Sequence, residues 1–224
     1  EDVFLKTLKK KHQVKNPQLL LETWQIASKI IPQVNRFHWR NWDADWSVES
    51  CMARPMLGGF RDVFDFVNNP TMQGENLLNP EQYTKMKLSG KTTSAETPDE
   101  VVERLIEWAE LALANCDMLE DEKLDASTNA LVHDIKAMAY LGLYYAGKIK
   151  AATQLAFYQQ TSNQEYKKQA VQKMKIALLA VNKYAEISNA SYHPQMLARP
   201  GLFDWGNMVE ETKKELDSLM NYRN

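Results

Sequence analysis

The chain has 224 residues, of which 44% are hydrophobic and 25% are charged, so one large domain can bury a substantial core. Its formal net charge is -2 and its pI is near 6.2, which excludes the concentrated basic charge typical of nucleic-acid-binding proteins. We therefore expect no nucleic-acid partner.

The two cysteines and the N-terminal sequence further limit the kind of protein to which this chain can belong. Cys51 and Cys116 are too few for a disulfide framework and lack metal-site spacing, so we expect two buried thiols. The sequence begins with Glu and contains neither a signal peptide nor a transmembrane segment. We expect a piece of a longer protein, without a membrane span.

Helical signals start near the N-terminus. Residues 1–16 join a short apolar pattern to Lys9, Lys10 and Lys11, which indicates a solvated N-terminal extension or a basic docking patch. Asn16-Pro17 supplies an N-cap and a proline at the first helical position, and the apolar spacing then continues to residue 38. Because Pro32 lies inside that pattern, we expect the helix to bend near it.

The segment 35–51 has the most unusual composition of the chain, with three of the six tryptophans. In one interpretation it is a glycan platform, because indole faces can cover the apolar faces of sugars while carboxylates and guanidinium groups orient hydroxyls. In the other it is a helix-turn-helix corner whose rings close one end of a bundle. The residues concerned are Trp39, Arg40, Trp42, Asp43, Asp45, Trp46 and Glu49.

Asp45 and Glu49 could be mistaken for an acid/base pair, because residues four apart share one face of a helix. Glycosidase carboxylates act from opposite sides of a bond, at a separation of about 5 to 10 Å. Spacing along a helix is therefore weak support for catalysis.

In the middle of the chain, helix-breaking residues alternate with signals for the start of a helix. Gly58-Gly59 precedes a short amphipathic helix that ends at Asn68-Asn69-Pro70. Residues 71–98 then mix Gly, Asn, Pro, Ser and Thr, which predicts a long surface excursion with little regular structure. Thr97-Pro98-Asp99-Glu100 restarts the helix as a capping box.

Four long apolar patterns follow, over residues 97–119, 129–159, 165–189 and 205–222. The stretch 129–159 is apolar over much of its circumference, so it should lie at the centre, with Gly142 and Gly147 admitting another backbone. Short polar connections favour antiparallel neighbours. The sequence predicts one all-α domain over 1–224, an antiparallel bundle of about five to seven helices around a central buried helix.

Residues 191–207 form a second aromatic loop, which adds His193 and Trp205 to the candidate ligand or domain contacts. The four histidines, at 12, 38, 133 and 193, lack the spacing of a zinc protease helix, and no phosphate loop, nucleophile elbow or di-iron Glu-x-x-His pair is present. We expect no metal, no cofactor and no catalytic residue in this chain.

Three phrases resemble a known group of proteins when their order and spacing are taken together. They are NRFHWRNWDADWSVESC, DIKAMAYLGLYYAGKIKAATQLA and RPGLFDWGNM. They are similar to the C-terminal helical region of large bacterial multidomain glycoside-hydrolase-like proteins, the α-glucuronidase-like set often labelled carbohydrate-binding. The resemblance covers roughly residues 20–210.

The resemblance implies that a barrel elsewhere in the parent protein performs hydrolysis, and that the helical region packs against it. It also implies an exported protein, periplasmic or on the cell surface, that acts on polysaccharide or oligosaccharide. The alternating strands and helices of such a barrel are missing here, so no catalytic residue is carried over.

Three functions stay open at this point. The first is a non-catalytic accessory domain that docks to an upstream catalytic domain and contacts glycan. The second is a protein-interaction or oligomerisation bundle, in which the same aromatic residues bury against another chain. The third is an independent glycoside hydrolase, which requires two carboxylates across a deep pocket.

Overall fold

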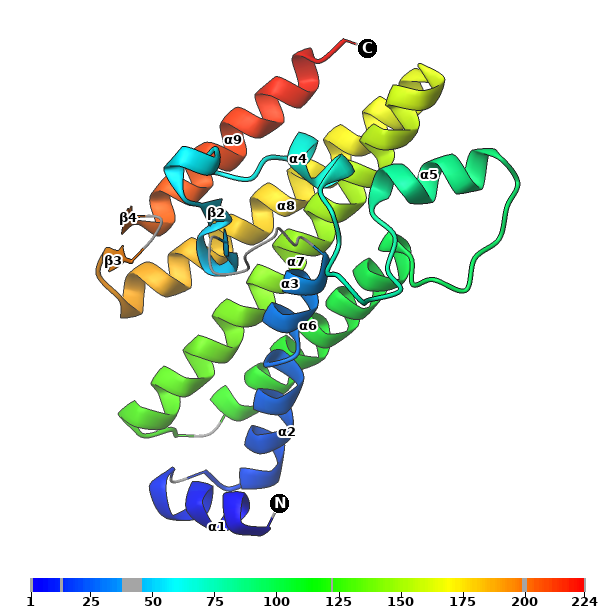
Figure 1. Ribbon diagram of the computed structural model, residues 1–224. Helices are drawn as coiled ribbons and strands as arrows, with labels where there is room; N and C mark the ends of the chain where they lie inside the picture. The colour runs from blue at the N-terminus through cyan, green and yellow to red at the C-terminus, as the bar shows by residue number, and fades with distance from the viewer. Residues whose placement is uncertain (1, 13, 38–45, 122, 199–200, 224) are drawn as a thin grey trace.

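Helix α7, Ala126–Thr161, runs through the middle of the bundle, as a computed structural model shows (Figure 1). The structure describes residues 2–12, 14–37, 46–121, 123–198 and 201–223. Asp125 caps α7 by accepting a hydrogen bond from the amide of Thr128, and the helix buries side chains around much of its circumference beyond Leu141. The all-α bundle around a central helix is confirmed.

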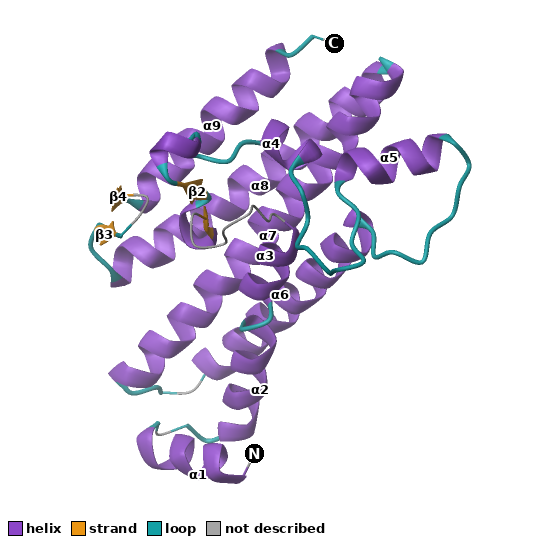
Figure 2. Cartoon of the chain, in the orientation of Figure 1, coloured by secondary structure: helices purple, strands orange, loops and turns teal. Residues whose placement is uncertain are grey.

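The other described helices are shorter than α7, and most of them pack on it (Figure 2). They are α1 (Asp2–Lys11), α2 (Pro17–Ala27), α3 (Ile30–Phe37), α4 (Val63–Asn68), α5 (Pro80–Leu88), α6 (Pro98–Glu120), α8 (Gln164–Ser191) and α9 (Trp205–Asn221). Helices α6 and α8 pack along opposite flanks of α7, and α9 packs on α8. Helices α2 to α5 cover much of the remaining surface of α7.

Two short antiparallel ladders interrupt the helices. Strand β1 (Trp46–Ser47) pairs with β2 (Met52–Ala53), with Trp46 opposite Ala53, and the 3-10 turn η2 (Val48–Ser50) joins them. Strand β3 (Gln195–Leu197) pairs with β4 (Gly201–Phe203), with Met196 opposite Leu202. A second 3-10 turn, η3 (Pro55–Leu57), leads toward α4.

Pro32 does not bend a continuous helix, so that prediction is wrong. Helix α2 ends at Ala27, and α3 begins at Ile30. Pro32 therefore lies in the first turn of a new helix, where its missing amide hydrogen costs no intrahelical hydrogen bond.

Two other segments also differ from expectation. In the aromatic segment, residues 35–37 end α3, and residues 46–51 belong to a hairpin and a 3-10 turn instead of the second helix of a helix-turn-helix corner. Cys51 turns the chain with a φ of 52°. The excursion 71–98 contains the helix α5, which Asn79 caps in a box with Gln82. Cys51 and Cys116 are buried free thiols, as predicted.

The two central glycines of α7 make different contacts. A Cβ atom at Gly147 would lie 3.0 Å from the backbone nitrogen of Ala177, whereas one at Gly142 would lie 3.0 Å from the side-chain tip of Ile30. Backbone in α8 cannot yield without moving the helix, whereas at Gly142 the buried Ile30 side chain has to shift by only a few tenths of an ångström. The sequence expectation that another backbone approaches closely is confirmed at Gly147, whereas the close neighbour of Gly142 is a side chain.

We expect Gly147→Ala to destabilise the protein by about 1–3 kcal/mol despite the better helix propensity of alanine. Gly142→Ala is the matched control, since it gains the same propensity but meets side-chain atoms and no backbone, and we expect a change within about 1 kcal/mol. Urea denaturation of the two variants measures the difference. Equal stability of the two would show that the α7–α8 approach does not limit packing.

Candidate functional site

The nine sequence-predicted contact residues divide into two groups. Trp39, Arg40, Trp42, Asp43 and Asp45 lie outside the described residues. Trp46, Glu49, His193 and Trp205 are described, and the structure places them in different surroundings.

Trp46 packs toward the core. Its ring meets Phe66 edge-on at a centroid distance of 6.3 Å and Tyr145 at 6.2 Å. Tyr145 also donates a hydrogen bond of 2.6 Å to the carbonyl oxygen of Val48, just after β1. Trp46 therefore anchors the start of the β1–β2 hairpin against α7 and α4.

Glu49 and Trp205 meet in a shallow concavity, which we call the aromatic cleft. Its volume is about 340 Å³. The residues around it come from α2, α3, α7, α8, α9 and η2 and from the residue that follows α8, and they include Trp24, Glu49, Asp134, Tyr184, Tyr192 and Trp205. His193 is exposed beside Tyr192 in sequence, and it is not among the residues that line the cleft.

Contacts hold two rings of the aromatic cleft, those of Tyr192 and Trp205. Tyr192 stacks on Trp205 at a centroid distance of 6.0 Å and donates a hydrogen bond of 2.6 Å to Asp134. This hydrogen bond raises the pKa of Tyr192. Trp205 is only 6% exposed, whereas Trp24 is 40% and Tyr192 is 42% exposed. The cleft thus has a buried indole behind two rings that face solvent.

Glu49 reaches the cleft because of the turn η2. The hydroxyl of Tyr184, on α8, donates a hydrogen bond of 3.1 Å to the backbone oxygen of Glu49, and the Glu49 side chain remains exposed. Trp24 was not predicted as a site residue, because in sequence it belongs to the apolar spacing of its helix. Only the packing of α2 on α7 brings Trp24 to the same cleft as Trp205.

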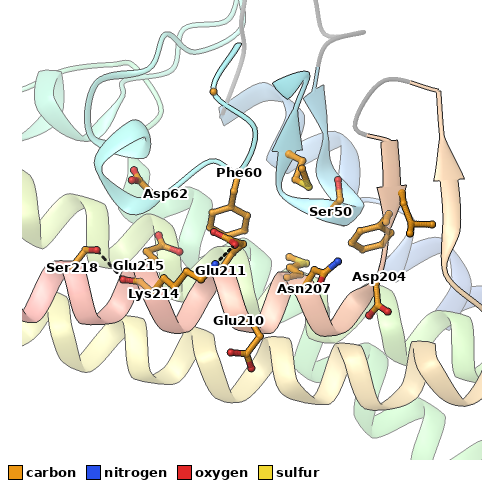
Figure 3. A pocket seen from close by; sticks show the side chains of 15 residues that line it. Ser50, Phe60, Asp62, Asp204, Asn207, Glu210, Glu211, Lys214, Glu215 and Ser218 are labelled. Atoms are coloured by element: carbon orange, nitrogen blue, oxygen red, sulfur yellow. Dashed lines mark hydrogen bonds and ion pairs between the residues drawn. The ribbon is translucent and has the colours of Figure 1, made fainter. Parts of the chain in front are cut away.

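A second and larger concavity, the acidic pocket, lies between α9 and residues 50–62 (Figure 3). Its volume is about 600 Å³. Five carboxylates line it, together with Phe60 and Lys214: Asp62, Asp204, Glu210, Glu211 and Glu215. Most of them already have partners, since Lys214 lies 2.6 Å from Glu211, Asp62 caps α4 and Asp204 caps α9.

A buried ion pair closes the inner wall of the acidic pocket. The Lys148 ammonium, on α7, lies 3.0 Å from Glu215 on α9, and the two side chains are 0% and 1% exposed. Lys148 also donates to the Tyr144 hydroxyl at 3.1 Å, to the backbone oxygen of Arg61 and to the Cys51 sulfur at 3.5 Å. The pair therefore ties α7, α9 and the segment around Cys51 together.

Burial raises the pKa of Glu215 from 4.5 to about 7, although Lys148 acts in the opposite direction. A raised carboxyl pKa in a pocket is a feature of catalytic acids. Here one Glu215 oxygen is held by Lys148, and the same lysine binds three further groups. This arrangement is the pattern of a structural cross-link.

In the described part of the chain, no group of three or more His, Cys, Asp or Glu side chains is arranged to hold a metal ion. Among the helices described, none combines the length and the apolar character that crossing a bilayer requires.

No protein-family model matches this chain, and no curated protein matches its sequence. Among solved structures the chain is similar to a GH138 enzyme targeting pectin rhamnogalacturonan II, with a TM-score of 0.79 at 17% sequence identity. The match covers 97% of this chain and 34% of that enzyme, so the chain spans about a third of its length. Similarity at this identity establishes the fold and leaves activity open. The chain thus has the fold of a part of a GH138 enzyme, which confirms the glycoside-hydrolase-like fold that the sequence resemblance implied, but not a position in a C-terminal region.

Proposed function

We propose that this chain is a non-catalytic helical domain of a carbohydrate-active protein, which supports a catalytic domain and contacts glycan through the aromatic cleft. The observation that carries the proposal is the fold similarity, which extends over 97% of this chain but over only 34% of a GH138 enzyme. The larger remainder of such an enzyme provides room for a separate catalytic domain.

The composition of the described elements supports an accessory role. In this part of the chain the strands form only two short ladders, and a hydrolytic (β/α)₈ barrel requires eight parallel strands. The five carboxylates of the acidic pocket are largely committed to helix caps and ion pairs, which leaves no free opposed pair of the kind that glycoside hydrolysis uses.

The aromatic cleft supports the glycan contact. Trp24 and Tyr192 offer ring faces that can cover the apolar face of a sugar. The carboxylates of Glu49 and Asp134 lie at the same cleft and can accept hydrogen bonds from hydroxyls. Because Tyr192 is fixed by Trp205 and Asp134, its ring is already oriented before a ligand binds.

Calorimetric titration with oligosaccharides prepared from rhamnogalacturonan II tests the glycan contact. We expect saturable binding that Trp24→Ala weakens by about tenfold, which corresponds to about 1.4 kcal/mol. Met118→Ala is the matched control, since it removes a large apolar side chain that is even more exposed than Trp24, 59% against 40%, from α6 outside the cleft. Loss of affinity in both variants, or none in either, would contradict a contact at the cleft.

The same oligosaccharides test the absence of catalysis by this chain. We expect no released sugar after long incubation with the purified protein. Turnover that disappears in Glu215→Gln or Glu211→Gln, with the protein still folded by circular dichroism, would establish an independent hydrolase and overturn the accessory role.

A further inference from the structure

A groove runs along α7 between α6 and α8, on the side of α7 that no other described helix covers. Its volume is about 570 Å³, and its lining is largely apolar. Leu143 lies on the floor, Ile106 on the α6 wall, and Ile176 and Leu179 on the α8 wall. Leu179 is 69% exposed and Ile176 is 42% exposed. We call this feature the α6–α8 groove.

The groove exists because α6 and α8 each pack on α7 and not substantially on one another. Gly147 sets α8 deep against α7, so the wall formed by α8 stands directly beside the floor. Exposed large apolar side chains that gather in one concavity are typical of surfaces that bind another protein.

The two walls carry opposite charges. The α6 wall presents Glu103 and Glu110, which are seven residues and about two turns apart. The α8 wall presents Lys173 and Lys183, which are ten residues and about three turns apart. Since α6 and α8 are both antiparallel to α7, they run in the same direction. The charged side chains that line the groove are therefore acidic along the α6 wall and basic along the α8 wall, where Lys183 also pairs with Glu186 at 2.8 Å.

We propose that the α6–α8 groove is a two-fold interface between two copies of this chain. A two-fold axis parallel to the groove places the α6 wall of one copy over the α8 wall of the other, with the helix directions kept. Glu103 and Glu110 then face Lys173 and Lys183 of the second copy, and the reverse contact forms by symmetry. The exposed leucine and isoleucine side chains of both copies fill the space between the two floors.

The charge pattern favours a second copy over an unrelated partner. A partner of different sequence would have to supply a basic stripe and an acidic stripe at the spacing of the two walls. A second copy supplies both, in the correct order, because an isologous interface pairs each surface with its own complement. The opposite charges of the two walls also fix how the two copies are oriented. An arrangement in which α6 faces α6, or α8 faces α8, would bring like charges together.

Sedimentation of charge-reversed variants tests the interface. The variant Lys173→Glu with Lys183→Glu has two acidic walls, and the variant Glu103→Lys with Glu110→Lys has two basic walls. We expect the wild-type chain to be dimeric in the micromolar range and each variant alone to have a dimer Kd raised by about tenfold or more. An equimolar mixture of the two variants should form a heterodimer, since acidic walls then meet basic walls.

The matched control is Lys168→Glu with Lys175→Glu, which makes the same charge change on the same helix, at residues that line a different part of the surface. This control should remain dimeric. A monomeric wild-type chain overturns the proposal, and so does a control that dissociates as readily as the groove variants. A mixture that stays monomeric while both variants are folded by circular dichroism overturns it as well.

Discussion

Glu215→Leu is expected to lower the free energy of unfolding by about 3–5 kcal/mol at pH 8, because it leaves the Lys148 charge buried without its carboxylate. Lys148 is fully buried, so water cannot replace the lost partner. The hydroxyl of Tyr144 and the backbone oxygen of Arg61 remain as acceptors, but neither carries a formal charge. Urea denaturation followed by circular dichroism measures the loss.

The control for this prediction removes both charges. Lys148→Met combined with Glu215→Leu leaves apolar side chains of similar size, and replacing a whole buried ion pair in this way is often neutral or stabilising. We expect the double variant to recover most of the stability lost in Glu215→Leu. If the single variant loses less than about 1 kcal/mol, the pair does not hold α9 to α7.

The raised pKa of Glu215 also makes the free energy of unfolding depend on pH. Between the ordinary value of 4.5 and the folded value of about 7, the folded state binds more protons at this carboxyl than the unfolded state does. The contribution of Glu215 to the free energy of unfolding therefore falls as pH rises through this window. The double variant lacks the carboxyl, so its stability profile should lose this slope.

The sequence predicted the long helices because their signals are local. Thr97-Pro98 with Glu100, and Asp125 before α7, are capping residues that act within one turn, and the apolar spacing repeats over many turns. The same kind of signal was present at Asn79-Pro80 with Gln82, and it marks the start of α5 inside the supposedly irregular excursion. A shorter helix offers too few repeats for its periodicity to stand out.

The sites could be predicted only in part, because they depend on contacts between distant segments. Composition identified Glu49 and Trp205 as candidates, but their meeting beside Trp24 and Tyr192 results from the packing of α2, α7 and α9. The partnership of Lys148 with Glu215 spans 67 positions, and in sequence Lys148 is simply a charge that interrupts an apolar helix. No local pattern distinguishes a buried lysine from an exposed one at such a distance.

Tyr145→Ala is expected to lower the free energy of unfolding by about 3–5 kcal/mol, the range for removing a large aromatic side chain from a core. Tyr145 is wholly buried, and its ring lies 6.1 Å from that of Phe66 and 6.2 Å from that of Trp46. The cavity would open beneath the β1–β2 hairpin, so hydrogen exchange should accelerate over residues 46–53 more than in α6.

Tyr145→Phe separates the ring from the hydroxyl. This variant keeps the aromatic contacts but leaves the backbone oxygen of Val48 without the donor that lies 2.6 Å away, at a cost of about 1–3 kcal/mol. Because Val48 and Glu49 belong to the same turn, the aromatic cleft should lose glycan affinity in Tyr145→Ala and retain most of it in Tyr145→Phe. Unchanged exchange over residues 46–53 in Tyr145→Ala would mean that the hairpin is held by other contacts, and that the position of Glu49 does not depend on α7.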